Sequence, residues 1–159
     1  MNERLQAMES RLESLEHWMK ENDKDTRCIS SGNTKQSCYK LVHQHMNWTE
    51  SRANCKRLGD GADLVSIETA EENEFLLDMI LDLRKSRCSA IWTSGKMISR
   101  GVWTWKATGQ LFGYTYWMSG QPDNLHGLED TMVFWDNRGD LHWNDGDPKS
   151  KQCSFCEFP

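Results

Sequence analysis

The most informative stretch for the architecture reads Trp48-Thr49-Glu50-Ser51-Arg52-Ala53-Asn54-Cys55-Lys56-Arg57-Leu58, followed closely by Gly59 and Gly61. It predicts a helix over residues 49–58 that the two glycines end. The candidate core positions of this helix are Trp48, Ala53, Cys55 and Leu58. The next apolar run, Leu64-Val65-Ser66-Ile67, predicts a short strand.

A second helix is predicted to begin after Thr69 and to end near Arg84. Thr69 is expected to cap it, and Glu71 and Glu72 suit the positive end of its dipole. Its apolar face comprises Phe75, Leu76, Met79, Ile80 and Leu83. From Ser89 onward the helical period is lost, and strands are predicted over 90–92, 102–105, 131–135 and 154–158, with a long loop over 106–130. Two helices followed by strands indicate the α+β class.

The first twenty residues carry a separate helical signal. An apolar seam recurs at spacings of three and four, formed by Leu5, Met8, Leu12, Leu15 and Met19. Residues 2–20 are therefore predicted to be a coiled-coil helix that self-associates, the alternative being a helix packed on its own domain. A polar connector follows over 21–27. We expect a neck and connector over 1–27 and one globular domain over 28–159.

Composition narrows the possible partners. The 159 residues include 24 acidic and 19 basic ones, for a net charge of -5, and the mean hydropathy is -0.77. Nucleic acid is a poor partner for such a surface, and no apolar stretch is long enough for a membrane span. The N-terminus lacks the apolar region of a signal peptide, so a secreted protein would be represented here by its processed chain.

Six cysteines, Cys28, Cys38, Cys55, Cys88, Cys153 and Cys156, allow fifteen sets of three bridges. The single CxxC motif, at 153–156, lacks both a second such pair and a preceding strand-to-helix turn. Zinc binding and thioredoxin-like chemistry are therefore disfavoured. The even count favours an oxidising, extracellular compartment.

Oxygen-bearing side chains gather in three short segments, Gln121-Pro122-Asp123, Glu129-Asp130 and Trp143-Asn144-Asp145. Amide and carboxylate oxygens without matching His or Cys suit Ca²⁺, which accepts six to eight oxygen ligands. Asp and Asn are also common in any loop, so this composition alone leaves an ordinary polar loop as the alternative.

Taken together, these segments resemble a C-type lectin-like domain, and the resemblance covers residues 28–158. The matching motifs, in the family's order, are Cys38-Tyr39-Lys40, residues 48–55, Ala62-Asp63-Leu64-Val65-Ser66-Ile67, Gln121-Pro122-Asp123, Trp143-Asn144-Asp145 and Phe155-Cys156-Glu157-Phe158. The run Ile91-Trp92-Thr93-Ser94-Gly95 resembles a variant common in invertebrate members. The resemblance implies two helices, small antiparallel sheets and a long calcium- and sugar-binding loop.

The resemblance also implies a ligand set. Gln121, Asp123, Glu129, Asn144 and Asp145 would hold one calcium ion and share two vicinal sugar hydroxyls with it, Pro122 being preceded by a cis bond. Members with this QPD order tend to prefer galactose, whereas EPN members prefer mannose. Galactose-binding members usually place a Trp shortly after QPD, where this chain has Leu125. His126 or Trp135 could substitute, although a core position is the main expectation for Trp135.

Three disulfides are implied: Cys28–Cys38, Cys55–Cys156 and, by exclusion, Cys88–Cys153. The family's usual bridge beside the sugar site is missing, because Thr131 and Pro148 stand at its positions, and this predicts a more mobile loop without calcium. A second calcium site would need acidic residues near 96–100, which are absent from the sequence there. The remaining tryptophans, Trp92, Trp103, Trp105, Trp117 and Trp143, are expected in the buried framework.

Asn47 begins a glycosylation sequon, with Thr49 expected to cap the adjacent helix. The resemblance favours a secreted, oligomeric lectin that binds terminal galactose or N-acetylgalactosamine in a calcium-dependent way. Such a protein would recognise or agglutinate glycans on cell or microbial surfaces in innate defence. The alternatives are a calcium-independent domain for a protein ligand and a glycosidase. We expect no enzyme, because the carboxylates stand at metal-ligand spacing.

Overall fold

A computed structural model of the chain describes residues 2–31, 35–83 and 87–159. The helices are α1 (Asn2–Asn22), α2 (Trp48–Lys56) and α3 (Ala70–Leu83), with a 3-10 turn η1 at Leu125–Gly127. The strands are β1 (Thr26–Ser31), β2 (Lys35–Met46), β3 (Asp63–Leu64), β4 (Ala90–Ser99), β5 (Val102–Trp105), β6 (Gln110–Leu111), β7 (Thr131–Asn137), β8 (Asp140–Gly146) and β9 (Gln152–Phe158). The predicted α+β class is confirmed. Arg84, where we expected α3 to end, lies outside the described residues.

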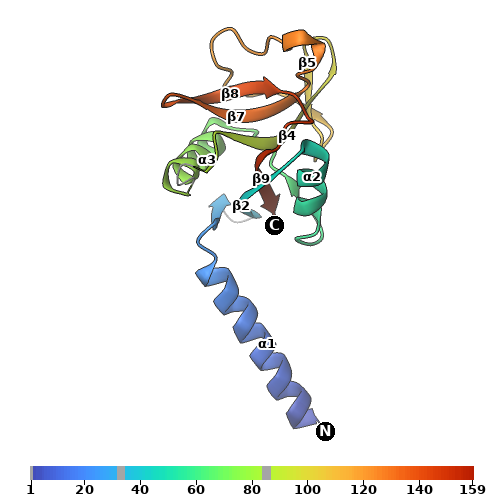
Figure 1. The fold of residues 1–159 in the computed structure, drawn as a ribbon. Helices are drawn as coiled ribbons and strands as arrows, with labels where there is room; N and C mark the ends of the chain where they lie inside the picture. Colours follow the sequence, from blue (N-terminus) through green and yellow to red (C-terminus); the bar gives the residue numbers. More distant parts are fainter. Residues whose placement is uncertain (1, 32–34, 84–86) are drawn as a thin grey trace.

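The strands form one connected sheet in the described part of the chain. Its main path runs β1-β2-β9-β4-β5-β6, with β3 beside β9 and the β7–β8 hairpin beside β4. The described pairs are antiparallel except β4 with β9, which is parallel. Because β2 pairs with β9, the start and the end of the domain lie side by side (Figure 1). The long loop and η1 lie at the end of the domain opposite α1 (Figure 1).

Two groups of buried side chains hold these layers together. The larger contains the apolar face of α3 and the indoles of Trp103, Trp105 and Trp143. The smaller contains Trp48 and Trp92. The expected buried framework of tryptophans is thus confirmed, with Trp117 partly buried against the larger group.

The start and the buried face of α2 differ from the prediction. Asn47, not Thr49, is the N-cap: its side chain accepts a hydrogen bond from the Glu50 N–H at 2.9 Å. The helix begins one residue earlier than expected, which places the cap before the tryptophan. Ala53 is exposed, because it lies on the face opposite Trp48 and Cys55, and Leu58 lies beyond the helix end with 43% of its surface exposed. Ser51 is buried instead.

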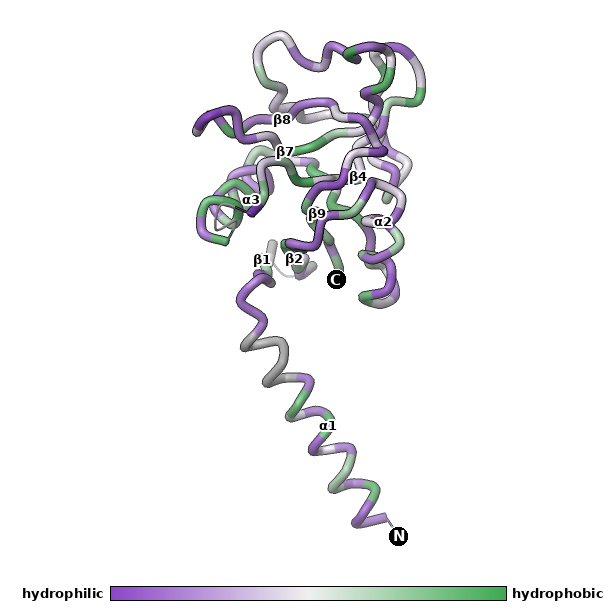
Figure 2. The backbone as a smooth tube through the Cα atoms, in the orientation of Figure 1, coloured by the Kyte–Doolittle hydropathy of each residue, from purple (hydrophilic) through white to green (hydrophobic). Residues whose placement is uncertain are grey.

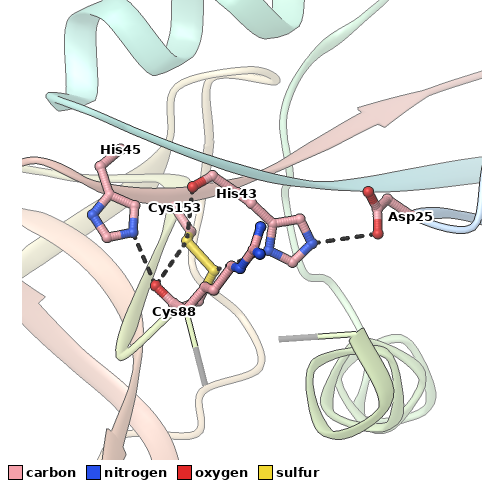
Figure 3. The surroundings of a disulfide bond; sticks show 6 residues. Asp25, His43, His45, Cys88 and Cys153 are labelled. Atoms are coloured by element: carbon pink, nitrogen blue, oxygen red, sulfur yellow. Dashed lines mark hydrogen bonds and ion pairs between the residues drawn. A yellow bond between two sulfur atoms is a disulfide. The ribbon is translucent and has the colours of Figure 1, made fainter. Parts of the chain in front are cut away.

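All three disulfides expected from the resemblance are present: Cys28–Cys38, Cys55–Cys156 and Cys88–Cys153. The third joins Cys88, just before β4, to Cys153 on β9. Its sulfur atoms lie beside His43, whose Nδ1 is 3.6 Å from the Cys88 Sγ (Figure 3). Because these sulfurs are bonded to each other, they are not available as thiolate metal ligands.

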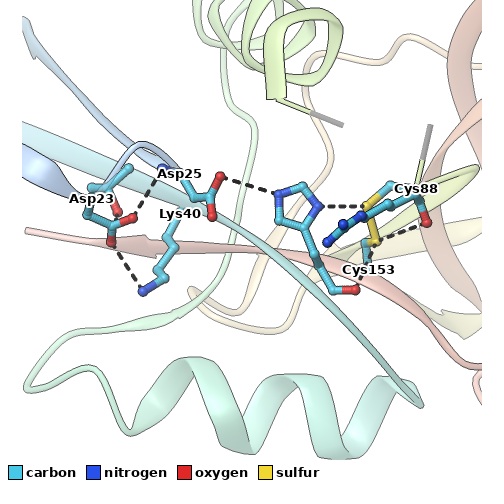
Figure 4. A network of polar contacts seen from close by, with 8 residues as sticks. Asp23, Asp25, Lys40, Cys88 and Cys153 are labelled. Atoms are coloured by element: carbon cyan, nitrogen blue, oxygen red, sulfur yellow. Dashed lines mark hydrogen bonds and ion pairs between the residues drawn. A yellow bond between two sulfur atoms is a disulfide. The ribbon is translucent and has the colours of Figure 1, made fainter. Parts of the chain in front are cut away.

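The connector after α1 is tied to the domain through its acidic residues. The Nε2 of His43 lies 3.3 Å from the Asp25 carboxylate, and the Lys40 ammonium lies 3.2 Å from that of Asp23 (Figure 4). The Asp23 carboxylate also accepts a hydrogen bond from the Thr26 hydroxyl at 2.7 Å. Residues 23–26 are therefore attached to β2, which gives the neck a defined point of origin.

The predicted N-terminal helix is present as α1, which extends away from the domain (Figure 1). Its hydrophobic positions recur along the tube among hydrophilic ones (Figure 2). Leu5, Met8, Leu12 and Leu15 are 53%, 66%, 61% and 57% exposed, whereas the Met19 side chain lies outside the described part. The alternative of a seam packed on its own domain is therefore not seen at these four positions. Among the described helices, none has the length and apolar character needed to span a membrane.

Candidate metal centre

The loop between β6 and β7 places the first of the predicted ligands. The Gln121–Pro122 peptide bond is cis, as the resemblance implied. The Gln121 N–H donates to the Met118 carbonyl at 2.9 Å, and the Met118 N–H donates to the Trp143 carbonyl at 2.9 Å. The loop segment with Gln121 and Asp123 is thus attached to β8, the strand that carries the predicted ligands Asn144 and Asp145.

Asn144 and Asp145 lie on β8, a strand that the sequence did not predict. In the β7–β8 hairpin, Asn144 is opposite Val133 and Asp145 is opposite Met132. Successive side chains on a strand point to opposite faces, so these two ligands approach the site from different sides. Trp143 anchors the strand to α3, because its indole N–H donates to the buried Asn73 side chain at 2.9 Å.

The structure brings all five predicted ligands to one pocket of about 350 Å³. Carboxylate oxygens of Asp123, Glu129 and Asp145 all lie within 4.8 Å of one another. The Gln121 Oε1 and the Asn144 Oδ1 are buried and have no hydrogen-bond partner among the described residues. A buried polar atom without a partner is costly, and a cation would satisfy both oxygens.

The carboxylates in this pocket repel one another. Burial, followed by the nearby carboxylates of Asp145 and Asp123, raises the pKa of Glu129 to about 7. Burial also raises the pKa of Asp145, against the lowering effect of N–H groups from Asn124 and Asp123. Carboxylates held together in this way favour protonation or a bound cation. Oxygen donors alone, with several negative charges, fit Ca²⁺.

Two aromatic candidates near the site differ in position. His126 lies on the exposed turn η1 with a φ of 58°, and it does not line the pocket of the five ligands among the described residues. Leu125 and Trp135 do line that pocket. Trp135 is half-buried against the smaller core group, so the expected core position is correct for part of its ring. The apolar side of the pocket around Trp135 was not predicted.

Thr131, at one position of the disulfide that the family usually has beside the sugar site, forms a hydrogen bond instead. Thr131 is fully buried, and its hydroxyl donates to the Gly146 carbonyl at 2.7 Å. Thr131 and Gly146 are also direct partners in the β7–β8 ladder. The end of β8 that carries Asn144 and Asp145 is therefore held to β7 by a polar contact.

Residues 96–100, where a second calcium site would need acidic residues, begin with a lysine that forms an ion pair. The Lys96 ammonium lies 3.1 Å from the Asp130 carboxylate and 5.1 Å from the centre of the Trp48 ring. Asp130, adjacent to the predicted ligand Glu129, is thus paired with lysine. The expectation of one calcium ion per domain stays a prediction.

The comparisons with known proteins agree with the fold and the motifs. The model of the family described as "Lectin C-type domain" matches residues 44–158, most of the chain. The protein therefore belongs to the C-type lectin domain family.

Two relatives and one solved structure illustrate the match. The C-type lectin lectoxin-Lio1 of Erythrolamprus poecilogyrus is 28% identical over 138 residues, which cover 84% of this chain and 81% of the relative. A perlucin-like protein of Mytilus galloprovincialis is 30% identical over 111 residues, covering 70% and 69%. The crystal structure of the C-type lectin CEL-I from Cucumaria echinata superimposes with a TM-score of 0.69 at 24% identity, covering 82% of this chain and 93% of that one. This last likeness concerns the fold.

Proposed function

We propose that this protein is a secreted, calcium-dependent lectin that binds terminal galactose or N-acetylgalactosamine. One observation carries the proposal: two buried amide oxygens without partners and three carboxylates meet in a single pocket. A domain that had abandoned metal binding would gain stability by losing Gln121, Glu129 and Asn144, because two unpartnered amide oxygens and a carboxylate beside other carboxylates are costly without a cation.

The chemistry of the site divides between metal and sugar. Calcium, when bound, would supply open coordination positions for two vicinal sugar hydroxyls. The side chains of Gln121, Asp123, Glu129, Asn144 and Asp145 would hold the ion through one oxygen each and use their remaining oxygens or N–H groups on the same hydroxyls. The backbone carbonyl of Asp145 is a sixth candidate ligand.

The preference for galactose rests on the order of amide and acid around Pro122. With Gln121 first and Asp123 second, the Gln121 side chain would offer an N–H donor and the Asp123 side chain a second carboxylate oxygen to the sugar hydroxyls from different sides of the site. Exchanging the two residues would exchange these sides, and a different pair of hydroxyls would fit. Leu125 stands where galactose-binding members usually place tryptophan, so stacking on the terminal sugar would come from His126 of η1, the ring that follows Pro122 closely in this loop.

Single sites of this open kind bind weakly, so we propose that α1 supplies the avidity. Its exposed leucine and methionine seam would pair with other copies of the chain. The domain would then present several sites, each at the end opposite α1 (Figure 1), toward repeated glycans on a cell or microbial surface. We propose binding rather than hydrolysis of these glycans.

Affinity columns provide the test. The protein is applied to immobilised galactose and to immobilised mannose, each with calcium and with EDTA, beside a Glu129→Gln variant. Retention on galactose that EDTA and the variant both abolish is the expected result. Retention on mannose instead would keep the metal site and discard the galactose preference. Binding that survives EDTA, or a protein ligand bound without calcium, would favour the calcium-independent alternative.

A further inference from the structure

The pocket that holds the five predicted calcium ligands extends beyond these residues over an apolar surface. Besides the ligands, it is lined by Ala90 and Trp92 of β4, Val133 and Trp135 of β7, Leu125 of η1, and Gln152 at the start of β9. A metal site needs the oxygen donors alone. The additional surface therefore offers room for a part of the bound molecule that does not touch the ion.

Strand register explains why the two parts adjoin. Asn144 is directly opposite Val133, and Val133 is directly opposite Trp92. Trp135 follows two residues after Val133 and is opposite Ala90. Since side chains alternate along a strand, these residues share one face of the sheet, and Trp135 lies about 7 Å along β7 from the position beside Asn144.

The floor of this region is fixed by buried contacts. Trp92 is 1% exposed, and its indole N–H donates to the Met46 carbonyl at 3.1 Å. Trp135 is half-buried, so one part of its ring packs on the core and another part faces the pocket. The facing aromatic surface is thus held in place before any ligand arrives, which lowers the entropic cost of binding.

The rim beside this floor is polar. Ser150 and Gln152 line the pocket and offer a hydroxyl and an amide. The turn before them is ordered by its own contacts, because the Asp147 side chain accepts from the Lys149 N–H at 3.0 Å and the Asp147 carbonyl accepts from the Ser150 N–H at 3.0 Å. An aromatic floor with a hydroxyl and amide rim suits a ligand with one apolar face and polar edges.

A pyranose ring has this shape, with C–H groups on its face and hydroxyls on its edge. We propose that the region formed by Trp135, Val133, Leu125, Ser150 and Gln152, here called the Trp135 subsite, binds the second sugar of an oligosaccharide whose terminal sugar occupies the calcium site. This inference rests on the proposed function and names its ligand more closely: an oligosaccharide end rather than a monosaccharide.

The test compares matched sugars by calorimetry in calcium. Methyl galactoside is compared with lactose, and methyl mannoside with α1-2-mannobiose, so that either terminal sugar is covered. We expect the disaccharide of the retained series to bind about 3- to 10-fold more tightly than its monosaccharide, the gain typical of one aromatic contact. The Trp135→Ala variant should lose this ratio while keeping its affinity for calcium and for the monosaccharide.

Further variants separate stacking from packing. Trp135→Phe should keep most of the ratio, because a ring remains, whereas Trp135→Leu fills space without a ring and should lose it. Tyr116→Ala is the matched control: Tyr116 is a half-buried aromatic that stacks on His142 with ring centres 4.3 Å apart, outside the pocket. If Trp135→Ala does not fold, Gln152→Ala at the rim replaces it.

The outcomes are distinct. A ratio near one in the natural protein, or a ratio that Trp135→Ala and Gln152→Ala both leave unchanged, overturns the subsite while calcium-dependent monosaccharide binding still supports the lectin. Absence of calcium-dependent binding to all four sugars overturns the proposed function and the subsite together.

Discussion

The carboxylate of Asp145 accepts a hydrogen bond from the backbone N–H of Asn124 at 2.6 Å. Its other oxygen lies 3.4 Å from the N–H of Asp123. Asp145 is 1% exposed on β8, whereas Asn124 belongs to the long loop after the cis bond. One buried side chain therefore both faces the predicted metal position and fixes the loop that brings Asp123 there. Glu129 is different, because its described contact with Asn124 uses its backbone N–H, at 3.1 Å.

This difference predicts opposite effects of two substitutions on the metal-free protein. Asp145→Ala and Glu129→Gln should each weaken calcium binding by more than about 100-fold, since even outer contacts of a metal site are worth 10- to 100-fold. In EDTA at pH 8, however, Asp145→Ala should lower the melting temperature, because the loop N–H groups lose their acceptor. Glu129→Gln should raise it, because the substitution removes a carboxylate that burial and its neighbours disfavour.

Calorimetric calcium titration and thermal melting in EDTA check both statements. Asp78→Asn, an exposed acid on α3 outside the site, is the matched control and should change neither quantity. The assignment of these ligands would be wrong if either variant bound calcium with the natural affinity.

A second prediction concerns pH. The folded pKa of Glu129 is about 7, above its ordinary value of 4.5, so the folded protein without metal prefers the protonated form. Its contribution to stability is therefore present below pH 4.5 and is lost as the pH rises through about 7. Calcium must displace this proton, so the affinity for calcium should fall as the pH drops from 8 to 6, well before ordinary carboxylates titrate.

Calorimetry in two buffers of different ionisation enthalpy measures the protons released on calcium binding. We expect clear release at pH 6.5 and little at pH 8.5. Glu157 has a pKa that is also raised to about 7, mainly by burial and by Glu72, but it does not line the pocket among the described residues. Its Glu157→Gln variant should alter the pH dependence of melting in EDTA and leave proton release from the Glu129 site in place. Equal proton release at both pH values would contradict the role of Glu129.

Much of this site could be predicted from the sequence, because two short motifs contain four of its five predicted ligands. The order of amide, proline and acid at 121–123 and the pair at 144–145 marks the ligands through the family resemblance, and the apolar period of 75–83 marks α3. β8 was missed because its sequence, Asp140–Gly146, alternates charged and polar residues with Leu141 and Trp143 rather than forming an apolar run. Its pairing with β7 becomes visible in the fold.

The apolar side of the pocket was missed for a related reason. Ala90, Val133 and Trp135 come from two strands that are far apart in the sequence, and their shared face depends on the register between β4 and β7. The predicted cap of α2 was wrong by two residues, because Asn47 and Thr49 are both good cap residues. The capping bonds between Asn47 and Glu50 decide between them in the structure.

A third prediction concerns the contact that occupies the place of the missing bridge. Thr131→Val keeps the shape of the side chain but removes the hydroxyl that donates to Gly146, which leaves a carbonyl without this partner. We expect a loss of about 1–3 kcal/mol in the free energy of unfolding and weaker calcium binding, because β8 carries the two predicted ligands Asn144 and Asp145. Thr131→Ser keeps the hydroxyl and should bind calcium nearly as the natural protein does. Urea unfolding and calcium titration measure the two effects, and equal calcium affinity in all three proteins would exclude a role of this contact in the site.

A fourth prediction concerns the neck. Leu5, Met8, Leu12 and Leu15 lie on one seam of α1, and each is more than half exposed in the single chain. A helix of 21 residues with such a seam gains stability by pairing with other copies, because burial of the seam then compensates for the cost of ordering a short helix. Light scattering should therefore find an oligomer, and the double substitution Leu5→Lys with Leu12→Lys should produce monomers. Ser10→Lys, on the polar face, is the control and should remain oligomeric.

The monomer should keep the affinity of each site for a soluble sugar but lose about 10²- to 10⁴-fold in binding to a glycan-coated surface, the typical gain from linked sites. A natural chain that is monomeric, or a double variant that binds the surface as well as the natural protein, would show that α1 does not supply avidity.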